Sequence, residues 1–282
     1  MERDIRSGRR LAKAAGFCIL LALSAPAGAA DLNGFLREKG HGDVALSYTA
    51  ESYDEFWRGG DKISDDGVGE VDTRTLSLWL AYGITDRLTF VGQLPYVDTE
   101  GDGTGNFEQD DLQDVTALAL YRLASFGGNA KSSFVGAFGL RTIASNYEPN
   151  SPVDVGDGTA DWLFRVIYQL TWRRIYVSQQ VGFDLRSGDA PDGYPFYTEV
   201  GATWGPVTYN LFYSTLRAED GTDIMDPGFT FPSNKEEYSR IGGKVYGRIT
   251  DHFGVSGAYF TTLDGRNTGE SSGVSLGVNV HY

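Results

Sequence analysis

The sequence predicts an all-β protein, a transmembrane up-and-down antiparallel β-barrel of about 12 strands. Three observations predict it. Apolar residues recur at every second position from Val44 to the last residue, Tyr282. The connections between these alternating segments are short and long in turn, as in outer-membrane barrels. An export signal precedes them, and no later stretch is apolar enough for a membrane-spanning helix.

The first 30 residues have the three-part layout of a secretory signal. Five basic residues precede the apolar run 14–25, and small residues at 27–30 follow Pro26. We expect a signal peptide over 1–30, cleaved near Ala29/Ala30, and an outer-membrane barrel over 31–282. A membrane anchor is the alternative, but the apolar run is shorter than the roughly 20 residues that span a bilayer. Cys18, the only cysteine, would leave with the signal.

Composition excludes several classes of protein. Without its first 30 residues the chain carries 19 Lys and Arg against 36 Asp and Glu, an acidic balance that argues against nucleic-acid binding. A mean hydropathy of −0.28 excludes a bundle of membrane helices. Barrel strands are compatible with this value because lipid-facing and lumen-facing residues alternate.

The strands are expected in chain order, and the last one is the clearest. Its alternate residues from Val274 to Tyr282 are apolar, and the intervening ones are small or polar. Trp162 and Trp172 end one apolar face, as suits the two interfaces of a bilayer. The expected spans are 43–57, 70–84, 87–98, 112–124, 131–145, 159–172, 174–187, 195–204, 207–218, 236–249, 252–263 and 271–282.

The connections predict the topology. Short turns are expected at 85–86, 125–130, 173–174, 205–206 and 250–251. Long connections are expected at 58–69, 99–111, 146–158, 188–194, 219–235 and 264–270. The dipeptide Asp-Gly, which favours tight reversals, occurs once in each long connection and in none of the short ones. Short turns face the periplasm and long loops the exterior in outer-membrane barrels.

One hairpin carries a family resemblance. The segment 81–97, Ala-Tyr-Gly-Ile-Thr-Asp-Arg-Leu-Thr-Phe-Val-Gly-Gln-Leu-Pro-Tyr-Val, resembles the signature hairpin of an outer-membrane transporter family named for the meta-pathway of phenol degradation. The Gly-Asp-Gly-Thr segments at 101–104 and 156–159, residues 111–114 and Arg141 are also similar. The resemblance covers nearly all of the chain after the signal. It implies a barrel and the passage of aromatic or other hydrophobic small molecules, and it carries over no catalytic residue.

Charged residues at lumen-facing positions are the candidate site. A bare Arg or Lys facing lipid at mid-depth would cost about 2–4 kcal/mol, so these residues should face inward. Three cations in a row, Arg240, Lys244 and Arg248, would bias a pore towards anions or pair with Glu199 and Asp184. Inward aromatics such as Trp79 and Tyr176 could line a path or simply pack, as could Tyr197. The predicted lumen-lining residues are Arg74, Arg141, Arg165, Asp184, Arg186, Glu199, Arg240, Lys244 and Arg248.

The three histidines, His41, His252 and His281, all fall at the predicted periplasmic end. A hydrolase would need one of them as a base, whereas known barrel hydrolases act on the outer side, so we expect no catalytic residue and no enzyme. The histidines could lie on neighbouring strand ends and bind a metal ion. We favour three unrelated residues at the rim.

The acidic loops give a further candidate. Asp98, Glu100 and Asp102 roughly match the start of a calcium-binding loop, but Glu100 breaks the pattern and Gln109 replaces the bidentate glutamate. They are weak metal candidates, and solvated loops bridged to lipopolysaccharide by divalent cations are the plainer reading.

The sequence thus predicts an outer-membrane channel or passive transporter for small solutes, aromatic or hydrophobic ones included, without a cofactor. The alternative is a non-conducting structural or surface-interaction barrel with acidic, cation-binding external loops. The expected partners are outer-membrane lipid, lipopolysaccharide, the solute, and the barrel assembly machinery during biogenesis, with no nucleic acid. A soluble periplasmic β protein is the alternative on architecture.

Overall fold

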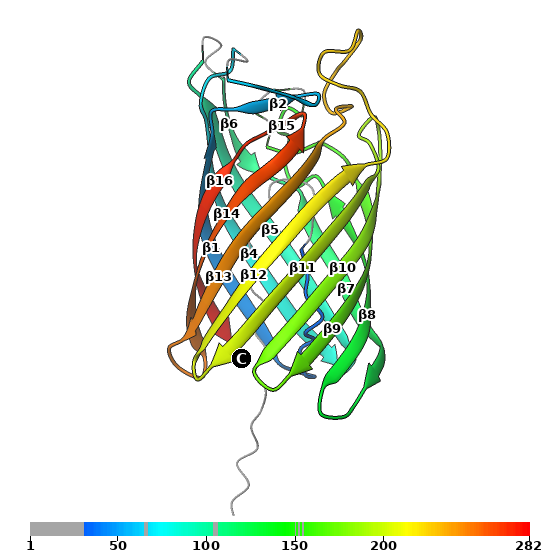
Figure 1. Cartoon of the computed structure of the whole chain (residues 1–282), viewed down its shortest axis with the longest axis vertical. Coiled ribbons are helices and arrows are strands. Elements are labelled where there is room, and N and C mark those ends of the chain that lie inside the picture. Colours follow the sequence, from blue (N-terminus) through cyan, green and yellow to red (C-terminus); the bar gives the residue numbers. More distant parts are fainter. Residues whose placement is uncertain (1–30, 65–66, 104–106, 150, 152, 154) are drawn as a thin grey trace, which may run out of the picture.

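The computed structural model describes residues 31–282 apart from 65–66, 104–106, 150, 152 and 154, so the predicted signal peptide lies outside the described residues. Twelve long antiparallel strands form the wall of a barrel (Figure 1). They are β1 (Gly42–Tyr53), β4 (Val71–Thr85), β5 (Leu88–Gly101), β7 (Val115–Phe126), β8 (Lys131–Thr142), β9 (Asp161–Trp172), β10 (Ile175–Arg186), β11 (Gly193–Trp204), β12 (Val207–Ala218), β13 (Glu237–Arg248), β14 (Phe253–Arg266) and β16 (Ser272–His281). The predicted fold class and strand number are confirmed.

Pairing of the first and last strands closes the barrel. β1 lies between β4 and β16, in register from Asp43 opposite His281 to Ser52 opposite Ser272. Tyr282 extends this closure, because its N–H donates to the carbonyl of Gly42 at 3.0 Å and its carbonyl accepts from the N–H of Gly42 at 2.9 Å. A closed sheet satisfies the backbone groups that lipid could not.

The outer face of the barrel is apolar. Along β16, Val274, Leu276, Val278 and Val280 are 42–66% exposed, as the alternation predicts for lipid-facing positions. Trp162 and Trp172, at opposite ends of β9, are each 46% exposed. Exposed apolar surface of this extent requires a membrane or a partner to cover it, and an apolar belt with flanking aromatics suits a membrane. Among the described residues no helix is long and apolar enough to span a membrane.

The two ends of the barrel differ, as the connection lengths predict. At one end, here called the turn end, the connections between wall strands are two to four residues long. The first wall strand, β1, begins at this end, and the last, β16, ends there (Figure 1). At the other end, the loop end, the connections are longer. They include a small antiparallel sheet of β15 (Thr268–Gly269), β2 (Phe56–Arg58) and β3 (Asp61–Ile63), and a short strand β6 (Phe107–Leu112) that pairs with the end of β5.

The inward face of the barrel has two chemically different walls. One is apolar and comes from β1, β4, β5, β7, β8 and β9. We define this apolar wall by its buried residues Ala45, Trp79, Ala81, Val91, Leu118, Leu120, Val135, Ala137, Leu163 and Ile167. The other is polar and comes from β9 to β13. We define this polar wall by the buried residues Gln169, Ser178, Gln180, Glu199, Asn210, Ser214 and Lys244.

Candidate functional site: a lumen that contains the N-terminal segment

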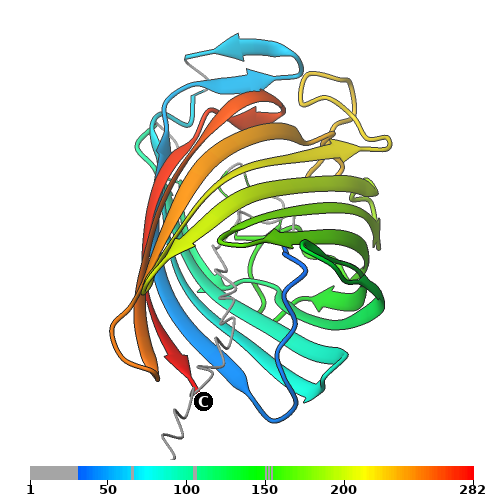
Figure 2. The same cartoon turned by 60° about the horizontal axis from the view of Figure 1, so that its bottom comes forward.

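The chain before β1 lies inside the barrel. This N-terminal segment, residues 31–41, runs from the lumen to the start of β1 at the turn end, and Figure 2 shows it as the dark-blue coil within the barrel. Leu32, Asn33 and Gly34 are buried, whereas residues 38–41 are exposed at the turn end. The segment therefore occupies part of the lumen.

The polar wall binds the backbone of this segment. The N–H of Leu32 donates to the side-chain oxygen of Gln180 at 3.0 Å, and the N–H of Gly34 donates to that of Gln169 at 3.0 Å. The Asn33 amide donates to a Glu199 oxygen at 2.9 Å. A buried backbone donor without a partner is costly, so these inward amides and acids replace the strand pairing that the segment lacks.

The apolar wall covers the side chains of the same segment. Leu32 is 3% exposed and belongs to the same buried cluster as Trp79, and Phe35 and Leu36 pack against that cluster. The ring of Phe35 meets Tyr176 edge to face, with centroids 5.0 Å apart. Burying a Leu or Phe side chain contributes about 1.5–3 kcal/mol, so these three residues are a substantial part of what holds the segment in place.

A charged latch fixes the segment where it leaves the lumen. Arg37 forms an ion pair with Asp43 at the start of β1. Asp43 also accepts a hydrogen bond from Nδ1 of His281 at 2.6 Å, and Nε2 of that ring lies 2.5 Å from the hydroxyl of Tyr246. Gly83 on β4 lies against the segment, and a Cβ there would overlap the backbone oxygen of Glu38. The segment and the turn end of the wall are thus fitted closely to each other.

The centre of the lumen is a compact charged cluster. A Glu199 oxygen accepts from the Tyr197 hydroxyl at 2.5 Å, and the Lys244 ammonium donates to the same hydroxyl at 3.0 Å and lies 4.0 Å from Glu199. Lys244 also lies 4.9 Å from the ring centre of Phe212, close enough for a cation–π contact. Tyr197 is 1% exposed and Glu199 is 2% exposed, so both side chains of the cluster are fully packed.

Most of the predicted lumen charges point inward and form pairs. Arg165 binds Asp184, with side chains 0% and 2% exposed. Arg141 Nε donates to Asp161 at 2.8 Å, and Arg186 pairs with Asp157. Of the three cations on β13, Arg240 binds Glu51 at 3.1 Å, Lys244 belongs to the central cluster, and Arg248 lies half-buried towards the turn end. Pairing, the second of the two alternatives above, therefore applies to Arg240 and Lys244, although Arg240 takes Glu51 rather than Asp184.

Arg74 does not line the lumen, contrary to the prediction. Val71, Thr73, Thr75 and Ser77 face the lumen on β4, so Arg74 faces outward at the loop end. Its guanidinium binds Glu100 at 2.8 Å and lies 3.5 Å from Asp98 on neighbouring β5. Its side chain is 46% exposed. The charge lies near the end of the strand, where a paired cation costs far less than at mid-depth.

The three weak metal candidates, Asp98, Glu100 and Asp102, interact with other groups of the protein. Asp98 and Glu100 belong to β5, an extended strand and not a calcium-binding loop, and both face Arg74. Asp102 accepts a hydrogen bond from the N–H of Glu70 at 2.7 Å. In the described part of the chain, no three His, Cys, Asp or Glu side chains are placed to hold a metal ion.

The histidines lie at the turn end, where the sequence places them, but in different surroundings. His41 is exposed, whereas His281 is buried in the latch with Asp43 and Tyr246. The His281 N–H donates to the His252 carbonyl at 2.9 Å, which brings those two residues together. The structure thus shows His281 as a wall residue that orients Asp43.

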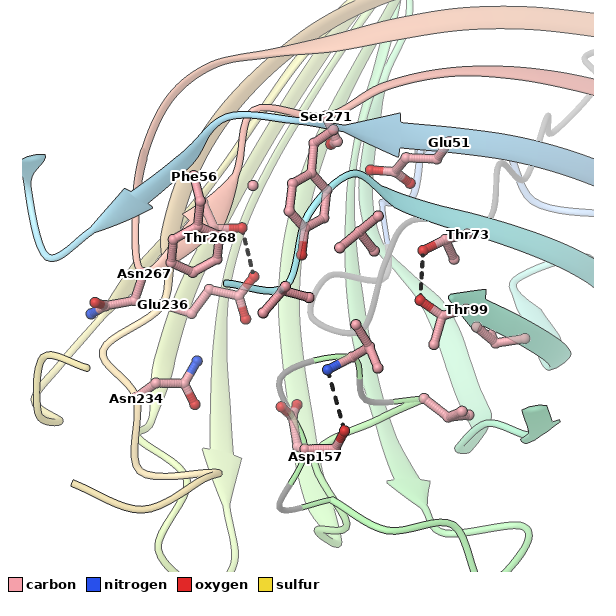
Figure 3. Close-up of a pocket in the computed structure, with 18 of the residues that line it drawn as sticks. Glu51, Phe56, Thr73, Thr99, Asp157, Asn234, Glu236, Asn267, Thr268 and Ser271 are labelled. Carbon is pink, nitrogen blue, oxygen red and sulfur yellow. Dashed lines mark hydrogen bonds between the residues drawn. The ribbon is translucent and has the colours of Figure 1, made fainter. Parts of the chain in front are cut away.

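A cavity of about 300 Å³ occupies the loop end of the lumen. Its lining is mixed. Apolar side chains include Tyr53, Phe56, Val71, Val97, Val155 and Phe231, and polar ones include Thr73, Thr99, Asn234, Glu236 and Arg240. In Figure 3 the carboxylate of Glu236 lies beside Thr268 and Phe56, with Thr73 and Thr99 across the view. The cap sheet of β2, β3 and β15 contributes Phe56, Arg58, Thr268 and Gly269.

Sequence reasoning missed both the N-terminal segment and the apolar wall. The available signal was the spacing of Leu32, Phe35 and Leu36, three large apolar residues between the export signal and the first strand. On β7 the large residues Leu118 and Leu120 point inward and the smaller Ala117 and Ala119 point outward, which alternation alone does not reveal.

Comparison with known proteins agrees with this architecture. The chain matches no protein-family model and no curated protein sequence. Among solved structures it is similar to an outer membrane channel of Pseudomonas putida F1, with a TM-score of 0.74 and 14% identity over 87% of this chain and 97% of that one. It is also similar to the NanC porin, with a TM-score of 0.53 and 9% identity over 85% of this chain and 98% of that one. The translocator domain of the autotransporter NalP from Neisseria meningitidis gives a TM-score of 0.50 and 11% identity over 87% and 90%. The chain therefore has the fold of outer-membrane β-barrels.

Proposed function

We propose that this protein is an outer-membrane channel for small solutes, closed at rest by its own N-terminal segment. The observation that carries the proposal is the dual fit of that segment, whose backbone binds the polar wall while its side chains cover the apolar wall. A barrel that served only as a scaffold would not need a segment of chain that fits both walls of its lumen. The channel and the porin among the similar structures support a conducting role.

The wall beneath the segment indicates which solutes would pass. Removal of Leu32, Phe35 and Leu36 would uncover the apolar wall opposite the polar wall, which carries amides, hydroxyls and the paired charges of Glu199 and Lys244. A solute with an apolar or aromatic body and one or two hydrogen-bonding groups matches such a two-sided path. The resemblance of residues 81–97 to the phenol meta-pathway hairpin supports the same class of solute.

Flux into proteoliposomes tests this proposal. We expect vesicles with a variant lacking residues 32–36 to take up a neutral aromatic solute such as 2-phenylethanol several times faster than vesicles with the full chain after signal removal. The matched control is Lys39→Ala, which changes an exposed residue of the same segment and should leave uptake unchanged. Because such a solute also crosses lipid, protein-free vesicles set the baseline. Equal uptake above that baseline by the deletion variant and the full chain would reject the role of the segment.

The second candidate, a surface barrel with cation-binding loops, receives less support. Asp223 in the long loop between β12 and β13 binds Arg266, and Glu55 and Glu270 both bind Lys62. These acids already have cationic partners within the protein, which weakens their attraction for divalent cations.

A further inference from the structure

The cavity at the loop end contains one carboxylate that lacks a cation of its own. Among the described residues Glu236 forms no ion pair, and its carboxylate accepts one hydrogen bond, from the Thr268 hydroxyl at 3.3 Å. Figure 3 shows the carboxylate turned into the cavity. Glu236 is half-buried, and the loss of part of its hydration raises the pKa of its carboxyl group.

The cations nearest to this carboxylate are committed elsewhere. Arg141, Arg186 and Arg240 are close enough to lower its pKa. However, Arg141 binds Asp161, Arg186 binds Asp157, and Arg240 binds Glu51.

The remaining charged residue of the lining is Arg58, which lies opposite Asp61 in the β2–β3 pair. Glu51 and Asp157 also line the cavity, and their arginines neutralise them. Among the described residues Glu236 and Arg58 are therefore the charged lining side chains that form no ion pair.

We propose that this cavity is a binding site for a small amphiphilic amine, whose ammonium group pairs with Glu236 while its apolar body fills the rest. A volume of about 300 Å³ is at the lower end of the range for small-molecule sites and accommodates a phenyl ring with a short chain. Phe56, Val97 and Val155 supply apolar surface for the ring, and Asn234 and Thr268 supply further hydrogen-bonding groups for the ammonium. An ammonium in this position would give this half-buried acid a counter-charge.

The biological role of this site rests on the proposed channel function, but binding of the amine can be measured without transport. Isothermal titration calorimetry of the full barrel in lipid nanodiscs, with three probes of one shape, tests it. The probes are 2-phenylethylamine, 2-phenylethanol and phenylacetate. We expect the amine to bind at least tenfold more tightly than the alcohol, since a charge-assisted hydrogen bond is worth more than a neutral one, and phenylacetate to bind most weakly.

Two variants isolate the carboxylate. Glu236→Gln should reduce the affinity for the amine to the level of the alcohol. It should leave the affinity for the alcohol unchanged. Glu237→Gln is the matched control, because Glu237 is the next residue, is also acidic, and contacts Arg217 instead of the cavity. It should leave the affinity for the amine unchanged. Phe56→Ala should reduce the affinities for the amine and for the alcohol by the same factor.

Three results would overturn the proposal. They are equal affinities for the three probes, an amine affinity that Glu236→Gln does not change, and tightest binding of phenylacetate, which would indicate an anion site at Arg58. Failure of amine binding would leave the flux result for the variant lacking residues 32–36 unaffected, and a failed flux result would leave amine binding measurable.

Discussion

Arg165 and Asp184 show at the scale of single residues how the barrel tolerates charge in its lumen. Their side chains are 0% and 2% exposed and bind each other. We predict that Arg165→Ala destabilises the barrel by about 3–5 kcal/mol, because it leaves Asp184 buried without a counter-charge. Urea unfolding followed by tryptophan fluorescence in lipid vesicles measures this loss.

The same measurement separates lost pairing from lost packing. Arg87→Ala, at an exposed position in the turn between β4 and β5, should change the free energy of unfolding by less than 0.5 kcal/mol, roughly the limit for ordinary surface positions. The double variant Arg165→Met with Asp184→Leu should recover most of the loss, since apolar residues of similar size often replace a buried pair without cost. A double variant as unstable as Arg165→Ala would contradict this account.

Glu236 carries a pH prediction at the same scale. Because its folded-state pKa is raised, its protonated form is favoured in the folded chain. Its contribution to stability is therefore complete at pH values below its unfolded pKa and is lost as the pH rises through the folded pKa. We expect Glu236→Gln to stabilise the barrel at pH 7 and to have no effect at pH 4, measured as urea midpoints at both values. A stabilisation that is the same at both pH values would show that burial of the acid is not its cause.

At the scale of elements, Asn267 joins three loops of the cap. Its side-chain amide donates to Asp223 and to the carbonyl of Lys235, each at 2.9 Å, and its oxygen accepts from the N–H of Gly59 at 2.8 Å. Its φ of 49° lies in the left-handed region. We predict that Asn267→Ala loosens the cap by about 2–4 kcal/mol, because hydrogen bonds are lost and alanine disfavours this backbone.

Hydrogen exchange of the Gly59 amide measures that loosening. Asn267→Gly removes the same hydrogen bonds but accepts the positive φ, so it should accelerate exchange less than alanine does. Identical exchange in the two variants would show that the backbone conformation contributes nothing.

The close packing of Gly34 in the N-terminal segment gives a second prediction at this scale. A Cβ on Gly34 would lie 2.6 Å from Cβ of Gln169, so any side chain there forces the segment away from the wall. We predict that Gly34→Ala weakens docking by about 1–3 kcal/mol, the typical cost of overpacking. Limited proteolysis should then cut within residues 31–41 faster than in the Lys39→Ala control. Equal protection would contradict the close fit of Gly34.

Elements also show how far the sequence could predict the structure. Strand positions and the alternation of turns and loops followed from period 2, because each wall strand has one face in lipid. The N-terminal segment did not follow, since it has neither strand periodicity nor strand partners and its hydrogen bonds go to Gln169, Gln180 and Glu199, far away in the sequence. Arg74 was misplaced because period 2 does not reveal which face of β4 is inward near a strand end, where Thr73 and Thr75 are as polar as their neighbours.

At the scale of the whole molecule, the barrel is divided along its axis. The loop end holds the mixed cavity and the middle holds the charged cluster around Glu199 and Lys244. The N-terminal segment runs from this cluster to its latch at the turn end. In the proposed closed state, a solute that enters the cavity would next meet the charged cluster and the end of the segment bound to it. Conduction therefore requires the segment to move away from the lumen wall.

Single-channel conductance in planar bilayers tests that requirement most directly, with the full chain after signal removal compared with the variant lacking residues 32–36. We predict that the full chain conducts rarely or in small steps and that the deletion variant gives stable steps at least several times larger. Correct folding of both is checked by the gel-mobility shift on heating. A folded deletion variant as silent as the full chain, or a full chain that already conducts as well as the variant, would contradict a lumen closed by its own N-terminal segment.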